Sequence, residues 1–314
     1  MFFYFILMAL TNNVLVSDFL FSTLQYIGFI LLIYWLYKQL FPKVAARYTT
    51  LFIYLMFFFL LIPVFEDRLG ITFQLLSISY HFGATIMALL SFNILIKYLL
   101  TGKRLWIILL IMAVSIGTAN DRLFLVQFVF PATVLAVFLF NRNGRKKLLV
   151  PLAAIALSAV AGIYLFRGLS LLNSIHIIGT GFKMFNFDNI ATSWHNLYNH
   201  LKGLFLAYHA ERTYILIMLI AFASSTVYLL MRLKKIFRPT QEQEMTPVYT
   251  LVMFTVFIPI VLFMPVINGA YVGRAIIRFN FMALVMGAIL LPLLLMNVEQ
   301  LFKKADPFLR KALP

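Results

Sequence analysis

Two short stretches place an acid beside an arginine at the end of an apolar run. They read "EDRL" at Glu66–Asp67 and "NDRL" at Asp121–Arg122. A carboxylate in such a place can take a proton from a hydroxyl as a general base, or bind a cation. The plainer interpretation is that these charges are solvated and mark turns between helices. The sequence leaves both interpretations open for Glu66, Asp67, Asp121 and Arg122.

A histidine and an arginine pair add further candidate chemistry. His81 lies near the predicted start of an apolar helix, and its proton exchange falls near neutral pH. Arg274 and Arg278 are four residues apart, so they share one helical face near a predicted N-terminus, where a phosphate could bind. The alternatives are a packed, hydrogen-bonded histidine, and arginines that extend to the membrane surface or pair with the acids.

The composition predicts the kind of fold that positions these residues. The chain has 314 residues, of which 63% are hydrophobic and 11% charged, against about 25% charged in soluble proteins. A membrane span needs about 20 apolar residues, and the chain offers many such runs. We therefore expect an all-α fold, a polytopic transmembrane helix bundle forming one integral membrane domain over 1–314. The chain contains no cysteine, which excludes disulfides and thiol chemistry.

The apolar runs predict nine spans. We place them at 19–41, 48–65, 77–100, 105–118, 123–140, 148–166, 213–231, 248–267 and 275–296. Residues 1–17 are ambiguous, because Thr11, Asn12 and Asn13 interrupt them. They fit an interfacial segment or the end of a helix that starts upstream. The first residues lack the basic region of a classical signal peptide.

The charges predict which side each loop faces. The net charge of +16 comes from short basic clusters between spans, a pattern that sets membrane topology and does not indicate nucleic acid. The largest clusters follow every second predicted span, so all of them lie on the same side of the membrane. That side is predicted to be cytoplasmic. The clusters lie at 38–47, 97–104, 142–147, 232–238 and 303–311. The histidines and the candidate acids fall on the opposite side, so any chemistry is expected at the outer face.

One longer outer loop, 167–212, contains a predicted amphipathic helix. Its apolar face comprises Ile190, Trp194, Leu197, Tyr198, Leu201, Phe205 and Tyr208. His195 lies on the polar face, with Asn196, Asn199 and Lys202. Such a helix fits the outer membrane surface, and the alternative is a lid over a site.

The spacing of the basic clusters limits the depth of the Asp121 turn. Two spans and a turn must fit between Arg104 and Arg142. Each helix then receives about 16 residues, or about 24 Å, whereas the hydrocarbon core is about 30 Å thick. The turn is expected to lie below the headgroups, facing a cavity. Alternatively, the membrane thins locally around it.

The stretches "SYHFGATIMALL", "ANDRLFLVQFVFPA" and "GRAIIRFNF" resemble the motif-bearing parts of bacterial membrane proteins related to GT-C-type glycosyltransferases. The resemblance implies transfer of a sugar from a polyprenyl-phosphate donor at the outer face. It implies that Asp121 or Asp67 acts as the base or helps to hold a divalent metal ion. It further implies that Arg274 and Arg278 stabilise the leaving lipid phosphate, and that the 190–208 helix covers the site.

The sequence departs from that family in one respect. The family's usual acid lies in the first outer loop, where this chain offers Asp18 or Glu66–Asp67. Two other functions therefore stay open: a transporter or lipid flippase, and a non-catalytic membrane subunit. In each case the expected location is a bacterial inner (plasma) membrane, with membrane lipid as a partner and no nucleic acid.

Overall fold

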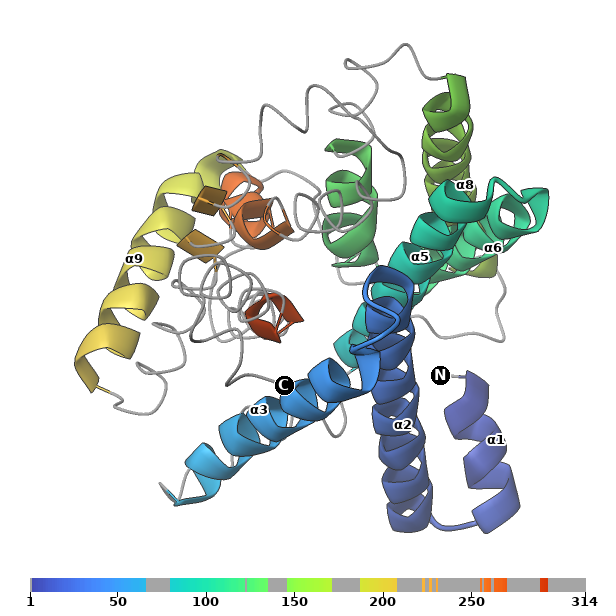
Figure 1. The fold of residues 1–314 in the computed structure, drawn as a ribbon. Coiled ribbons are helices and arrows are strands. Elements are labelled where there is room, and N and C mark those ends of the chain that lie inside the picture. Colours follow the sequence, from blue (N-terminus) through green and yellow to red (C-terminus); the bar gives the residue numbers. More distant parts are fainter. Residues whose placement is uncertain are drawn as a thin grey trace, which may run out of the picture.

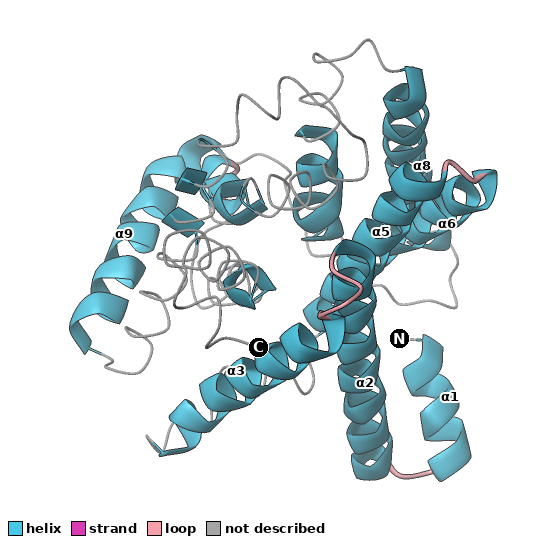
Figure 2. Ribbon diagram, in the orientation of Figure 1, coloured by secondary structure: helices cyan, strands magenta, loops and turns pink. Residues whose placement is uncertain are grey.

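The computed structural model describes part of the chain. The described residues are 2–65, 80–121, 123–134, 146–170, 187–207, 222–223, 226–227, 230, 255, 257–260, 263–269 and 289–292. These residues form helices, and the described part contains no strand (Figure 2). The all-α prediction is confirmed for this part of the chain.

The longer helices match the predicted spans. The elements are α1 (Phe2–Thr11), α2 (Val14–Leu40), α3 (Ala45–Phe65), α5 (Tyr80–Thr101), α6 (Arg104–Asn120), η1 (Leu125–Val129), α8 (Lys146–Ser170), η2 (Phe187–Asn189) and α9 (Ile190–Ala207). Three of them, α2, α5 and α8, contain stretches long and apolar enough to cross a membrane. They coincide with the predicted spans 19–41, 77–100 and 148–166. The total of nine spans stays a prediction, because the last three predicted spans lie largely outside the described residues.

Residues 2–11, which the sequence leaves ambiguous, form the helix α1. The polar residues at 11–13 form a turn that reverses the chain, so that α1 lies beside the first half of α2 (Figure 1). Asn12 adopts a left-handed conformation with φ of 49°, which asparagine tolerates better than most residues. The Asn13 side chain accepts a hydrogen bond from the Val16 N–H at 3.2 Å and caps α2. This cap explains why α2 begins five residues before the predicted span.

Hydrogen bonds between helices hold α2 in the bundle. Asn93 on α5 is fully buried, and its Nδ2 donates to the carbonyl of Leu32 at 3.1 Å. Its Oδ1 accepts from Gln39 Nε2 at 2.8 Å. The Tyr37 hydroxyl donates to the carbonyl of Ile289 at 2.9 Å, which joins α2 to the C-terminal part of the chain. Where lipid offers no hydrogen bonds, such pairs are the available way to bury polar groups.

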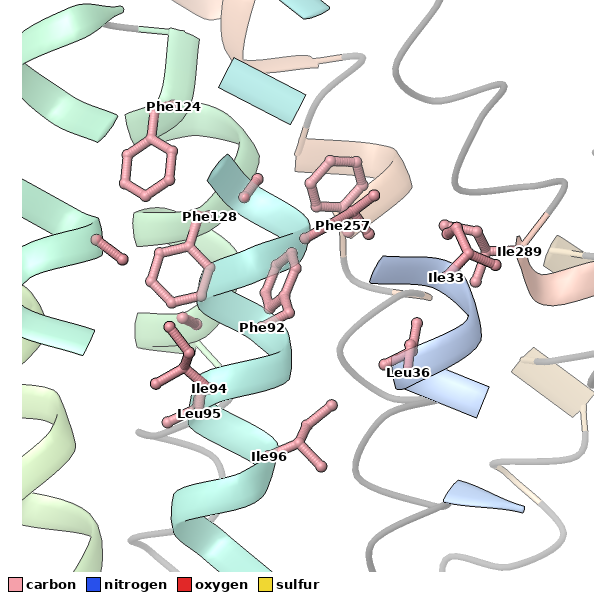
Figure 3. Close-up of a cluster of buried hydrophobic side chains, with 14 of the residues drawn as sticks. Ile33, Leu36, Phe92, Ile94, Leu95, Ile96, Phe124, Phe128, Phe257 and Ile289 are labelled. Atoms are coloured by element: carbon pink, nitrogen blue, oxygen red, sulfur yellow. The ribbon is translucent and has the colours of Figure 1, made fainter. Parts of the chain in front are cut away.

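Large side chains fill the centre of the bundle. The rings of Phe92 and Phe128 lie 4.8 Å apart in an edge-to-face arrangement, and Phe124 lies 5.5 Å from Phe128 (Figure 3). Phe257 extends the cluster on the other side of Phe92, at 6.3 Å. This cluster ties α5 to the helix after Asp121 and to the C-terminal third of the chain.

The contact between α6 and α8 is made by small residues. On α8, Ala154, Ser158 and Gly162 recur every four residues and are buried, whereas Leu157 is 71% exposed and Tyr164 64% exposed. The Ser115 hydroxyl of α6 donates to the carbonyl of Ser158 at 3.3 Å. Small residues inside and large apolar residues outside are typical of helices that pack in lipid, because close approach of the backbones replaces hydrophobic burial.

Substitution of Gly162 by alanine should separate these two helices. A Cβ at this position would lie 2.6 Å from the carbonyl oxygen of Ser115 and 2.7 Å from Thr118 Cβ. We expect Gly162→Ala to lower the free energy of unfolding by about 1–3 kcal/mol. Thermal unfolding of the purified protein in detergent measures this effect.

Gly168 on the same helix is the matched control. A Cβ there meets nothing within 4 Å. Gly168→Ala should be neutral or slightly stabilising, because alanine favours helix more than glycine does. Equal midpoints for the two variants would contradict the close packing of α6 on α8.

Candidate functional site

Asp121 joins α6 to the helix that follows, and its backbone and side chain both shape the turn. Its N–H donates to the carbonyl of Gly117 at 3.0 Å and closes α6. Its carbonyl accepts from the N–H of Phe124 at 3.0 Å, and its Oδ1 accepts from the N–H of Leu123 at 2.8 Å. Asp121 thus ends one helix and caps the next, where a negative charge also favours the helix dipole. These hydrogen bonds support the interpretation that Asp121 marks a turn between two helices. The other interpretation, that Asp121 lines a site, stays a prediction.

The two helices that Asp121 joins are in contact beside the turn. A Cβ on Gly117 would lie 2.8 Å from the ring of Phe124, so the ring packs on a position that only glycine leaves open. The first arm, α6, has 17 residues and is therefore about 25 Å long. This length matches the about 16 residues that the sequence predicts for the helix, and the depth of the turn below the headgroups stays a prediction. The Asp121 side chain is half-buried at this turn.

The second arm contains a π-helical turn, η1, which the sequence analysis did not predict. The N–H of Phe130 donates to the carbonyl of Leu125, five residues earlier. Pro131 follows directly; it has no N–H, and its ring would clash with the carbonyl of Gln127 in a regular α-helix. A widened turn relieves this clash, and single π turns inside helices occur frequently at functional sites.

Gln127 lies inside the π turn and is fully buried. Neither its Oε1 nor its Nε2 has a hydrogen-bond partner in the described structure. The hydroxyl of Thr118, on the first arm, is likewise buried without a partner there. Both residues lie within about two helical turns of Asp121. Buried polar groups without partners are rare in proteins and call for an explanation.

Of the remaining predicted site residues, two are described at least in part. His195 is exposed on α9, which lies across the molecule from α6 and α8, so the structure does not bring His195 next to Asp121 (Figure 1). His81 lies in the first turn of α5, and only its backbone is described. Glu66, Asp67, Arg122, Arg274 and Arg278 lie outside the described residues, so their roles stay predictions.

The amphipathic helix predicted over 190–208 matches α9, although only part of its predicted apolar face is buried. Leu197 and Ser193 are buried against the protein, while Trp194 is about half exposed and Tyr198 is 62% exposed. The Trp194 ring lies 5.7 Å from Phe263, which positions α9 beside the helical residues 257–267. His195, Asn199 and Lys202 are exposed, as the predicted polar face requires. Exposed tryptophan and tyrosine are typical of helices at a membrane interface.

The described residues do not assemble a metal site. They contain no group of three or more histidine, aspartate or glutamate side chains that could hold an ion.

Two substitutions of Asp121 separate the contribution of its charge to stability from the contribution of its cap. Asparagine accepts the same N–H bond as aspartate and ranks with it as an N-cap, whereas alanine cannot. Asp121→Ala should lower the free energy of unfolding by about 1 kcal/mol, and Asp121→Asn should leave it nearly unchanged. Thermal unfolding of the two variants in detergent provides the comparison. An Asp121→Ala protein as stable as the natural chain would show that the cap contributes nothing.

The comparisons with known proteins provide no relative for this chain. No protein-family model matches it, and neither does any curated protein or solved structure.

Proposed function

We propose that this protein is a GT-C-type membrane glycosyltransferase that uses a polyprenyl-phosphate-linked sugar donor at the extracytoplasmic face of a bacterial inner membrane. The observation that supports this most is the half-buried carboxylate of Asp121, fixed by its own cap between two short helices. A carboxylate held in one orientation is suited to take a proton from an acceptor hydroxyl. Ionisable groups at membrane depth often have functional roles.

The proposed reaction is a displacement at the sugar. Asp121 removes the proton of the acceptor hydroxyl, the hydroxyl oxygen forms a bond to the anomeric carbon, and the bond to the lipid phosphate breaks. Arg274 and Arg278 stabilise the phosphate that leaves. Arg122, His81 and His195 are proposed to bind substrate, and Glu66 or Asp67 is the alternative base. In this proposal α9 lies on the outer membrane surface at the edge of the site.

Substitution of Asp121 by asparagine tests the base directly, because the cap is kept. Purified protein would be given polyprenyl-phosphoglucose, and two quantities would be measured: lipid binding by native mass spectrometry and release of polyprenyl phosphate in the presence of membrane extract as acceptor. We expect Asp121→Asn to bind the lipid as the natural chain does and to lose transfer at least 100-fold, the usual contribution of a general base.

The matched variant is Arg274→Ala/Arg278→Ala, which should lose lipid binding itself. Failure of the natural chain to bind polyprenyl-phosphoglucose or polyprenyl phosphate would contradict the glycosyltransferase proposal. So would full transfer by an Asp121→Asn protein in which Asp67 is also replaced by asparagine.

A second function is favoured by one observation, the π turn and Pro131 in the core of the bundle. Interrupted helices at mid-membrane form the substrate sites of many transporters. A transporter or lipid flippase would move a fluorescent polyprenyl-phosphate analogue across proteoliposomes without cleaving it. Such movement in the absence of transfer would replace the first proposal with this one.

A further inference from the structure

Basic side chains gather where α2 meets α3 and where α5 meets α6. They are Lys38, Lys43 and Arg47 around the first loop, and Lys97, Lys103 and Arg104 around the second. All six are exposed except Lys97, which is partly exposed. The segments 38–47 and 97–104 contain no acid. Both loops face the side that is predicted to be cytoplasmic.

The acids that the structure describes lie too far away to balance these charges. Asp18 is 20 residues before Lys38 along α2, and Asp121 follows the opposite end of α6 from Lys103. At 1.5 Å per residue the separations are about 30 Å and about 27 Å, whereas salt screens exposed charges within about 8 Å. Asp188 precedes α9, which lies across the molecule from α6 (Figure 1). The positive charge at the two loops is therefore open to a negative partner.

Two tryptophans connect the ends of α2 and α6 near these loops. The rings of Trp35 and Trp106 lie 6.1 Å apart, and both pack against the core of the bundle. Lys38 follows Trp35 by one helical turn, and Lys103 precedes Trp106 by three residues. The two lysines therefore lie on the loop side of the same aromatic contact.

The helix α5 contributes a third lysine to this end of the bundle. Both α2 and α6 pack on α5. Asn93 faces α2, because its Oδ1 accepts a hydrogen bond from Gln39 Nε2 at 2.8 Å. Lys97 follows Asn93 by four residues, so it lies on the same face of α5, one turn nearer the loop. Three successive long helices, α2, α5 and α6, thus each provide one lysine beside the tryptophan pair.

The surroundings of the lysines favour a lipid as their partner. Toward the middle of the bundle, α2 exposes Leu31, and α6 exposes Ile108 and Met112, each by more than half of its surface. Tryptophans are enriched where a helix passes from the hydrocarbon core to the headgroups. Lysines directly beyond such a level attract anionic headgroups. A soluble anion would match the lysines but not the apolar surface that continues from them.

We propose that Lys38, Lys97 and Lys103 bind the phosphate of an anionic membrane phospholipid, whose acyl chains lie along the exposed apolar surfaces of α2 and α6. Ammonium groups donate charge-assisted hydrogen bonds to phosphate oxygens. The bound lipid connects α2 to α6 and stabilises their packing on α5. This surface lies on the opposite side of the membrane from the predicted location of Arg274 and Arg278, and its role does not depend on sugar transfer.

The experiment compares two phospholipids on the purified protein in detergent. Dissociation constants for phosphatidylglycerol, which is anionic, and phosphatidylcholine, which is neutral overall, would be measured by native mass spectrometry. The natural chain should prefer phosphatidylglycerol. The variant Lys38→Gln/Lys97→Gln/Lys103→Gln should bind phosphatidylglycerol more weakly, by about fivefold for each lysine removed, with its affinity for phosphatidylcholine unchanged. Phosphatidylglycerol should raise the thermal midpoint of the natural chain and not that of the variant.

Two further variants are the controls. Lys38→Arg/Lys97→Arg/Lys103→Arg keeps the three charges and should keep the preference for phosphatidylglycerol. Arg167→Gln/Lys202→Gln removes two exposed cations from α8 and α9 and should also keep it. The first control separates charge from packing, and the second separates this surface from the net charge of the whole chain.

Several results would overturn the inference. They are equal affinity of the natural chain for the two lipids, an unchanged preference in the glutamine variant, and loss of the preference in either control. Binding of heparin that the glutamine variant loses, without a preference between the two lipids, would assign the surface to a soluble polyanion instead. If the glutamine variant fails to fold, Lys38→Gln and Lys103→Gln are measured singly, because both side chains are exposed. Each should lose about fivefold, and unchanged affinity in both would contradict the proposal.

Discussion

The hydrocarbon core of a membrane contains no water, so a polar group inside the bundle either pairs with another group of the protein or stays unpaired at a cost in free energy. The described helices show how far this constraint organises the chain. Asn93 bonds across to α2, the Tyr37 hydroxyl reaches the carbonyl of Ile289, and Ser115 bonds to α8. Each of these bonds joins two helices, so the need to pair polar groups also determines which helices are neighbours.

The same environment explains why side-chain size sorts the surfaces of α6 and α8. Lipid tails are as apolar as leucine, so burying leucine brings no advantage over exposing it. Two helices are instead held together by close approach of their backbones. Gly162 permits this approach, and Leu157 does not hinder it because it lies on the outer face of α8. Close approach of α6 and α8 fixes the first arm, and Gly117 then lets the ring of Phe124 seat the second arm. The position of Asp121 follows from these contacts.

The sequence predicts the helices better than the details that give the site its chemistry. Composition and apolar runs predict α2, α5 and α8 within a few residues. The separation of polar and apolar residues onto two helical faces predicts α9. The start of α2 differs because the cap at Asn13 outweighs the polar character of the preceding residues. The π turn has no periodicity of its own, and only Pro131 in the run "LVQFVFPA" indicated it. Gln127 was visible as a lone polar residue in that run, but its lack of a partner is a property of the packed bundle.

In the proposed function, the Asp121 turn faces the extracytoplasmic side, where a lipid-linked donor would reach it. The chain contains no cysteine, so single cysteines can be introduced without background labelling. Asn120 and Thr101 are both exposed, and they end α6 and α5 respectively. In intact cells a membrane-impermeant maleimide should label Asn120→Cys, and should label Thr101→Cys only after the membrane is permeabilised. Labelling of Thr101→Cys but not Asn120→Cys in intact cells would place the turn on the cytoplasmic side and contradict the account.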